Sequence, residues 1–273
     1  MDKELFRKAV FDVIDELHAL GYDLPETLKR RDPREPGRDE KERFEDRLLM
    51  VIRRLFKKQK AAIIARLEQN FPGRKDLSPI PLDDLINGNG DDELMAQLIR
   101  VISLSAVGGV NLFSDMVSIG LDYSLIKDEA LRYARDHAYD LIGLSTEGID
   151  ATTRDLVSNA ITRFIETPGT TLGDITRQLE DVFSLNRAQM IAVTETTNAF
   201  AMGQQIAGEA LLAQFPDVRV VKKWYTNNDD RVCPICAPLN GEEVDIKDNF
   251  SHGGANPPAH PRCRCWTHVR TRI

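Results

Sequence analysis

Apolar residues recur at helical spacing over most of this chain. Near the N-terminus they share one face until Gly21 ends the run: Phe6, Val10, Val13, Ile14 and Leu17. Two prolines and a glycine within 32–37 then predict a linker. A longer amphipathic helix is predicted over 39–70, and its apolar stripe consists of Phe44, Leu48, Val51, Ile52, Leu55, Ile63 and Leu67.

A second break, rich in proline, glycine and asparagine, covers 72–92, and helical periodicity then continues to about Gln214. We predict further helices at 92–106, 110–122, 124–143, 151–166, 171–183 and 186–214. Gly108 and Gly109 could break or kink the second of these helices, because glycine weakens a helix. No repeat with a period of about 20–50 residues is evident, which disfavours a solenoid.

The pattern changes after Pro216. Three segments rich in β-branched and aromatic residues predict strands, at 218–226, 243–246 and 265–269, and turn-rich stretches separate them. The predicted fold class is therefore α+β, a mainly α-helical body with a small C-terminal β-rich module. We expect three regions: a helical and basic region at 1–90, a helical body at 91–215 and a cysteine-rich β-module at 216–273.

Composition and charge narrow the class of protein. The chain has 273 residues and a formal net charge of -7, as many soluble proteins do. Its start lacks the apolar core of a secretory signal, and no apolar run is expected to reach the roughly 18 residues of a membrane helix. We therefore expect synthesis in a cytoplasm and no membrane partner. All four cysteines lie between 233 and 265, and in a reducing compartment such a cluster indicates a metal site more often than disulfides.

The first half of the candidate site resembles a zinc knuckle. Cys233 and Cys236 are separated by two residues, so both sulfurs can face one point. Gly241 follows shortly and allows a tight turn that leaves backbone amides free to donate to thiolates. The sulfur-rich set predicts a closed, structural zinc site, because catalytic zinc keeps a position open to water. The alternative is that the cysteines are buried thiols, or disulfides in an oxidising setting.

The second half supplies His260, Cys263 and Cys265 about 25 residues later. Five candidates for four positions leave the fourth ligand open. If the segment is extended, Cys263 and Cys265 point to the same side of a strand, and four cysteines bind the metal. If the chain turns through Pro261, His260 approaches Cys263 and replaces Cys265. We favour the four-cysteine set.

A basic stretch stands out in this acidic chain. Residues 29–75 contain 16 Lys or Arg against 8 Asp or Glu, a net charge of +8. Five basic side chains lie close together beside the apolar stripe of the long helix: Arg53, Arg54, Lys57, Lys58 and Lys60. They are candidates for contacting the phosphates of nucleic acid. A solvated helix face with alternating charges is the simpler interpretation.

Catalytic candidates are few. Glycine-rich phosphate loops of the Walker or dinucleotide-binding type are absent from the sequence. A polar run at 194–198 lies inside the last long helix, and its Glu195 could be catalytic, although a polar face that packs on a neighbouring loop explains the run better. His137 has helical neighbours and no obvious nucleophile beside it.

Several short motifs occur in order between Ile191 and Cys265. They are Thr194-Glu195 with Ala199 and Gly203 on a helix; Lys223-Trp224; Asp230-Arg231-Val232-Cys233-Pro234-Ile235-Cys236; Leu239-Asn240-Gly241; and Pro257-Pro258-Ala259-His260-Pro261-Arg262-Cys263-Arg264-Cys265. This ordered set resembles the phage Mu F-like minor head proteins, also called phage head morphogenesis proteins. Looser similarity extends back to about Lys127, and residues 1–90 match no known pattern.

The resemblance implies a virion protein of a tailed bacteriophage or prophage, assembled in the host cytoplasm and present in few copies in the head. Its expected partners are the portal protein, other head proteins and packaged double-stranded DNA. Its expected role is in head morphogenesis and in DNA packaging or ejection, by binding and not by catalysis. The alternative is a metal-dependent enzyme, such as a nuclease or a transferase that uses Glu195.

Overall fold

The computed structural model describes residues 34–70, 92–117, 123–142, 149–167, 171–227, 229 and 232–272. The helix predicted over 6–17 and nearly all of the break predicted over 72–92 lie outside these residues. The described helices are α2 (Arg38–Asn70), α4 (Asp92–Val117), α5 (Tyr123–Ile142), α6 (Ile149–Glu166), α7 (Leu172–Val182) and α8 (Leu185–Gln214). A small antiparallel sheet follows them, so the predicted α+β class is confirmed.

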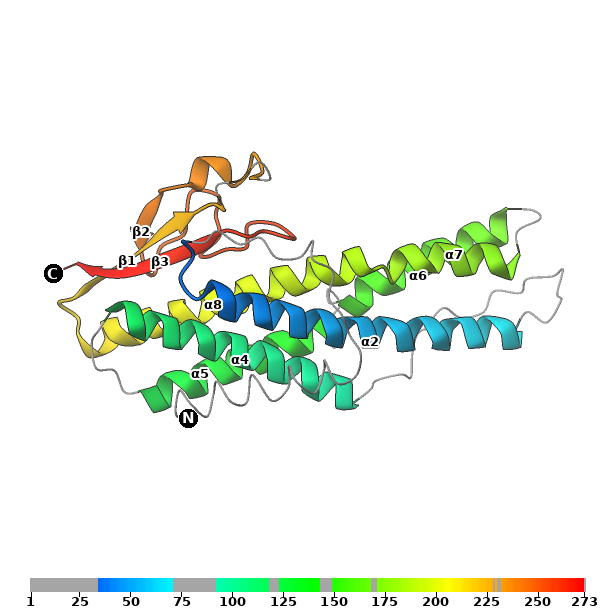
Figure 1. The fold of residues 1–273 in the computed structure, drawn as a ribbon, viewed down its shortest axis with the longest axis horizontal. Coiled ribbons are helices and arrows are strands. Elements are labelled where there is room, and N and C mark those ends of the chain that lie inside the picture. Colours follow the sequence, from blue (N-terminus) through cyan, green and yellow to red (C-terminus); the bar gives the residue numbers. More distant parts are fainter. Residues whose placement is uncertain are drawn as a thin grey trace.

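The helices form an elongated body. Figure 1 shows α2 and α8 along the long axis, with the sheet at one end and α6 and α7 at the other. Helix α4 packs on α8, α5 and α2, whereas α6 and α7 pack on each other. A capping box begins α7, where the Thr171 hydroxyl and backbone N–H donate to Asp174 at 2.7 and 2.8 Å, as expected for a helix start near that residue.

Helix α4 corrects the prediction of two helices at 92–106 and 110–122. It runs without a break from Asp92 to Val117, through Gly108 and Gly109. A Cβ at Gly109 would lie 2.2 Å from the backbone oxygen of Phe200, and one at Gly203 would lie 2.0 Å from the oxygen of Ala106. These glycines therefore allow α4 and α8 to approach at backbone distance, and they do not end the helix.

The same helix corrects the expectation that no apolar run reaches membrane length. Ala96–Val117 is 22 residues long and apolar enough, by length and composition, to cross a membrane. More than half of its apolar window is buried against the rest of the chain. Residues such as Ile102, Val110 and Phe113 lie in the largest hydrophobic cluster, so the apolar composition is that of a central core helix.

The sheet has the order β2-β1-β3, with β1 (Arg219–Tyr225) between β2 (Glu243–Asp245) and β3 (Trp266–Arg272). The three predicted strands are confirmed, although β3 extends to Arg272. One face of β1 presents Val220, Lys222 and Trp224, all buried. Successive side chains of a strand point to opposite faces of its sheet. The face with Val220, Lys222 and Trp224 therefore points toward the helical body and the metal site, and the other face points away from them.

Among the residues that the structure describes, hydrophobic burial occurs in three clusters. The largest combines residues of α2, α4, α5 and α8 with Val220, Ile246 and Val269 of the C-terminal module. A second joins the end of α2 to α6 and α7 and includes Ile63 and Val157. The third lies inside the module and consists of Trp224, Cys236, Leu239, Phe250, Cys263 and Cys265. Three of the four cysteines thus belong to the module's own core.

Candidate metal centre

The first loop of the site is a tight turn built by its two cysteines. The backbone N–H of Cys236 donates to the Cys233 carbonyl oxygen at 3.1 Å and faces the Cys233 Sγ at 3.3 Å. A short 3-10 helix (Ala237–Leu239) follows directly. Gly241 has φ +89 and donates its N–H to the Trp224 oxygen at 2.8 Å, which returns the chain to the sheet. This turn is compatible with the predicted zinc knuckle.

The second loop is also a turn. The N–H of Cys263 donates to the His260 carbonyl oxygen at 3.2 Å, and Arg262 has φ 63. Proline at the second position and a positive φ at the third are the features of a type II turn. The chain therefore turns through Pro261, as the alternative ligand set requires, while Cys265 stands immediately before β3.

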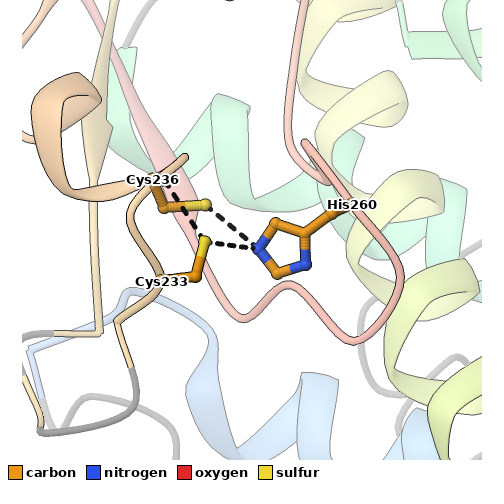
Figure 2. A group of neighbouring side chains, drawn as sticks. All are labelled: Cys233, Cys236 and His260. Carbon is orange, nitrogen blue, oxygen red and sulfur yellow. Dashed lines mark hydrogen bonds between the residues drawn. The ribbon is translucent and has the colours of Figure 1, made fainter.

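The two loops meet at Cys236. The Nε2 atom of His260 lies 3.0 Å from the Sγ of Cys233 and 3.3 Å from the Sγ of Cys236, and Figure 2 shows the ring nitrogen pointing at both sulfurs. The Sγ atoms of Cys236 and Cys263 are 3.8 Å apart. Two groups, each with ligand atoms within 4.8 Å of one another, share Cys236: one with Cys233 and His260, the other with Cys263 and Cys265. All five predicted residues thus form one cluster that could hold a metal.

The ring of His260 is already oriented for metal binding. Its Nδ1 lies 2.8 Å from the Pro261 carbonyl oxygen and can donate a hydrogen bond to it. This contact leaves the Nε2 lone pair facing the two sulfurs. Metal-binding histidines almost always make such a contact through their second nitrogen, because it sets the tautomer and the ring orientation.

Burial and hydrogen bonding divide the thiols into two kinds. The Cys265 thiol and the backbone N–H groups of Cys265 and Ala259 donate to the Cys263 sulfur, and together they hold the pKa of Cys263 at about 5 against the effect of burial. The hydrogen bond to Cys263, together with burial, raises the pKa of Cys265. Burial raises the pKa of Cys236. The pKa values of these two neighbouring thiols therefore shift in opposite directions, and Cys263 is the more acidic of the pair.

The donor atoms fit a structural zinc ion. A tetrahedral zinc with Zn–S bonds of about 2.3 Å holds its sulfurs about 3.8 Å apart, and this is the spacing between Cys236 and Cys263. Cys236 and Cys263 are almost fully buried, and Cys233 and His260 are half-buried. Soft sulfur and imidazole donors in a closed, partly apolar setting suit zinc better than magnesium or calcium.

The polar run on α8 lies beside this site. The Thr194 hydroxyl accepts the N–H of Arg262 at 2.7 Å, and the Thr197 hydroxyl donates to the Cys263 carbonyl oxygen at 3.3 Å. Thr194 and Thr197 thus pack on a neighbouring loop, as the simpler interpretation of the run predicted. The contacts of Arg262 could not be found from the sequence, because its partners precede it by about 70 residues and no local pattern connects them.

Glu195 and His137 form a contact that sequence reasoning missed. The Nε2 of His137 on α5 lies 2.5 Å from the Oε2 of Glu195 on α8. Asn198, one turn further along α8, donates to the Tyr133 hydroxyl at 3.0 Å, and the Tyr133 ring stacks on His137. Tyr133 and His137 are one helical turn apart on α5, and Glu195 and Asn198 are one turn apart on α8. The sequence shows this spacing, but it does not show that α5 packs on α8. The network joins α5 to α8 and gives Glu195 a structural contact within the helical body.

The five basic candidates on α2 have different surroundings. Lys57 and Lys58 are exposed, whereas Arg53 and Arg54 are half-buried. The Nζ of Lys60 lies 3.1 Å from an oxygen of Glu180 on α7, an ion pair within the chain. Two other basic residues of the 29–75 stretch, Lys41 and Arg47, are buried, and Lys41 pairs with Glu35 at 2.5 Å. Glu35 and Glu45 are buried too, so among the described residues burial removes as many negative as positive charges, and only Lys57 and Lys58 of the five candidates are exposed.

Comparison with known protein families identifies one segment. Residues 154–268 match the family model described as "Phage Mu protein F like protein". The match runs from α6 to β3 and includes both loops of the metal cluster, which confirms the predicted resemblance. Of the looser similarity expected back to about Lys127, the part from 154 onward lies within the match and 127–153 lies outside it. No curated protein and no solved structure matches the chain.

Proposed function

We propose that the protein is a minor head protein that binds the portal of a tailed bacteriophage or prophage, because its residues 154–268 match the Phage Mu protein F like family model. The family match is the observation that carries the proposal, because it runs from α6 through α8 and includes both loops of the metal module. The protein is assembled in the host cytoplasm and remains in the virion, where it acts in head morphogenesis and in DNA packaging or ejection.

The module's part in this function is to present a rigid surface. A three-stranded sheet with long loops buries little apolar surface of its own, and a metal ion supplies the missing stability. We propose zinc, bound by Cys233, Cys236, His260 and Cys263, with Cys265 as a thiol that donates to Cys263. The positions of His260 and of the type II turn support this set over four cysteines.

Packaged double-stranded DNA is a second proposed partner. Lys57 and Lys58 are exposed on α2 and would contact phosphates without regard to base sequence. The portal protein and other head proteins are the alternative partners of the same surface. The division into regions 1–90, 91–215 and 216–273 also stays a prediction.

Co-purification tests the portal assignment. The chain, co-expressed with the portal protein of the same phage or prophage genome, is expected to be retained on the tagged portal. Purified heads should contain it in few copies per particle, as measured by mass spectrometry. A chain that is abundant in the lysate but absent from heads and portal complexes would contradict the proposal.

Charge reversal tests the DNA contact. The double variant K57E/K58E should weaken binding to duplex DNA in gel-shift titrations, and wild-type binding should fall steeply between about 50 and 200 mM salt. A matched control is R177E, which reverses an exposed charge on α7. If wild type does not bind DNA at about 50 mM salt, where screening is weakest, DNA is removed from the partners.

Metal removal also distinguishes the proposed binding protein from the alternative, a metal-dependent enzyme. A structural zinc should be held tightly, at one ion per chain, and its removal should disorder the cysteine loops of the module. A catalytic zinc would be exchanged without loss of folding, and a Glu195→Gln variant would then lose a nuclease or transferase activity that wild type shows.

A further inference from the structure

Arg262 occupies a backbone position that glycine adopts more readily. It is the third residue of the turn from His260 to Cys263, and its φ is 63. A residue with a side chain is strained in this left-handed region. Such a position is retained where the surrounding structure holds it, so the contacts of this arginine are informative.

Those contacts all lie on α8. The backbone N–H of Arg262 donates to the Thr194 hydroxyl at 2.7 Å. Its guanidinium donates to Asn186 Oδ1 at 2.9 Å and to Gln189 Oε1 at 3.2 Å. The Thr194 hydroxyl in turn donates to the Met190 carbonyl oxygen at 2.7 Å, which orients its lone pair toward the loop. Backbone and side chain of one residue are thus held by three consecutive turns of one helix.

The two candidate ligands at the ends of this turn are positioned by the same attachment. His260 and Cys263 flank Pro261 and Arg262, and the Cys263 carbonyl oxygen accepts a further hydrogen bond from Thr197, also on α8. We propose that Arg262 is a positioning residue that couples the metal centre to helix α8. This inference rests on the metal site proposed above. It adds that metal binding stabilises the helical body through the contacts of Arg262 with α8.

The coupling must act in both directions. If the attachment holds His260 and Cys263 in place for the metal, then the bound metal stabilises the attachment and the first three turns of α8 to the same extent. Metal loss is therefore expected to loosen 186–197, although no residue of α8 belongs to the metal cluster. A loop that only happened to touch the helix would show neither effect.

The rate of zinc release from the full-length, zinc-loaded protein measures how far the Arg262 contacts hold the metal in place. R262A is expected to release zinc to a chelator at least ~10-fold faster than wild type, as for other residues that orient metal ligands. T194V should show a smaller increase, and R262K should be intermediate because it keeps the charge but not the two-pronged contact. The matched control is R219A, which removes an exposed arginine that pairs with Asp245 of β2, and it should release zinc at the wild-type rate.

Amide hydrogen exchange measures the second direction. Zinc removal from wild type should increase exchange at 186–197, and R262A should increase it there even when zinc is bound. Should R262A fail to fold, the double variant N186A/Q189A removes the same guanidinium contacts from the helix side and leaves the loop intact. Zinc release from R262A or N186A/Q189A within twofold of wild type, or unchanged exchange on zinc removal, would overturn the coupling alone. A wild-type chain that holds no zinc would overturn the metal site, and the coupling with it.

Discussion

At the scale of single residues, the site depends on which atoms face one another across the two loops. His260 and Cys265 are both within the cluster, but they face different neighbours. The His260 nitrogen faces the sulfurs of Cys233 and Cys236, whereas Cys265 is grouped with Cys236 and Cys263 and stands immediately before a strand. Proximity alone therefore does not separate the proposed ligand His260 from the proposed supporting thiol Cys265.

Single substitutions separate these roles. H260A should reduce zinc affinity by at least ~100-fold, because it removes one of four ligands, while C265S should lower it by about 10-fold or less, as expected for a residue that only supports a ligand. Chelator competition gives both affinities, and H268A on β3 is the control histidine. Retention of zinc by H260A together with its loss from C265S would instead establish the four-cysteine set.

Lys222 is a buried cation of the module. Its Nζ donates to Gln205 Oε1 at 2.9 Å and lies over the Phe250 ring, and the side chain has no exposed surface. Burial lowers the pKa of Lys222 to about 8 from an ordinary value of 10.5. Between these two pH values the unfolded chain binds one proton more than the folded chain. Folding stability should therefore rise with pH over that window.

The variant K222M tests this pH dependence. Methionine removes the free-energy cost of burying the Lys222 charge, and it also removes the hydrogen bond to Gln205. Because the first contribution is the larger, the variant should be more stable than wild type by about 1–2 kcal/mol at pH 7. Its advantage over wild type should shrink as pH rises from about 8 to 10.5, since wild type is then neutral at this position. Urea unfolding of both zinc-loaded proteins at several pH values gives the difference, and a constant difference would contradict the shifted pKa.

At the scale of elements, the contact between α4 and α8 organises the body. Gly109 and Gly203 face each other, so the two backbones approach without intervening side chains. Phe200 lies in the same contact and closes against Gly108, where a Cβ would come within 2.7 Å of its ring. Small residues at a helix crossing allow close packing, which is why this central helix carries two glycines.

Gly203→Ala should separate these helices. Its Cβ would meet backbone atoms that cannot rotate away, so we expect a loss of about 3 kcal/mol or more. Gly173→Ala on α7 is the matched control, because the nearest atom to its Cβ is 3.5 Å away. Alanine should stabilise that helix by up to about 1 kcal/mol. Equal effects of the two variants in thermal unfolding would exclude the close approach.

At the scale of the whole molecule, the module is joined to the body in two ways. Val220, Ile246 and Val269 belong to the largest core, which ties the sheet to α4 and α8. The cysteine loops enclose a separate small core around Trp224 and Phe250. Metal loss should therefore disorder the loops while the sheet stays on the body, a more local effect than unfolding of the entire module.

Fluorescence of Trp224 reports this difference. In a W266F background Trp224 is the only tryptophan, since the chain has two. Chelation should shift its emission to longer wavelength and leave the helical circular dichroism almost unchanged. A chelated protein that loses much of its helical signal would show that the metal stabilises the body as well. An unshifted emission would show that the small core does not need the metal.

Local patterns in the sequence were enough for most of the described elements and for the five residues of the metal cluster. The apolar stripe of α2, the strands after Pro216 and the two cysteine motifs each depend on neighbours within a few residues, where helical and strand periodicity operate. The resemblance to the Mu F-like family used the same local motifs. The tertiary structure decided what depends on distant partners: whether Gly108 and Gly109 break α4, which nitrogen or sulfur faces Cys236, and where Arg262 is attached. Each of these features depends on how whole helices and loops pack: how closely two backbones approach, where a lone pair points, and which residues about 70 positions apart come into contact. A short window of sequence holds no information on that packing.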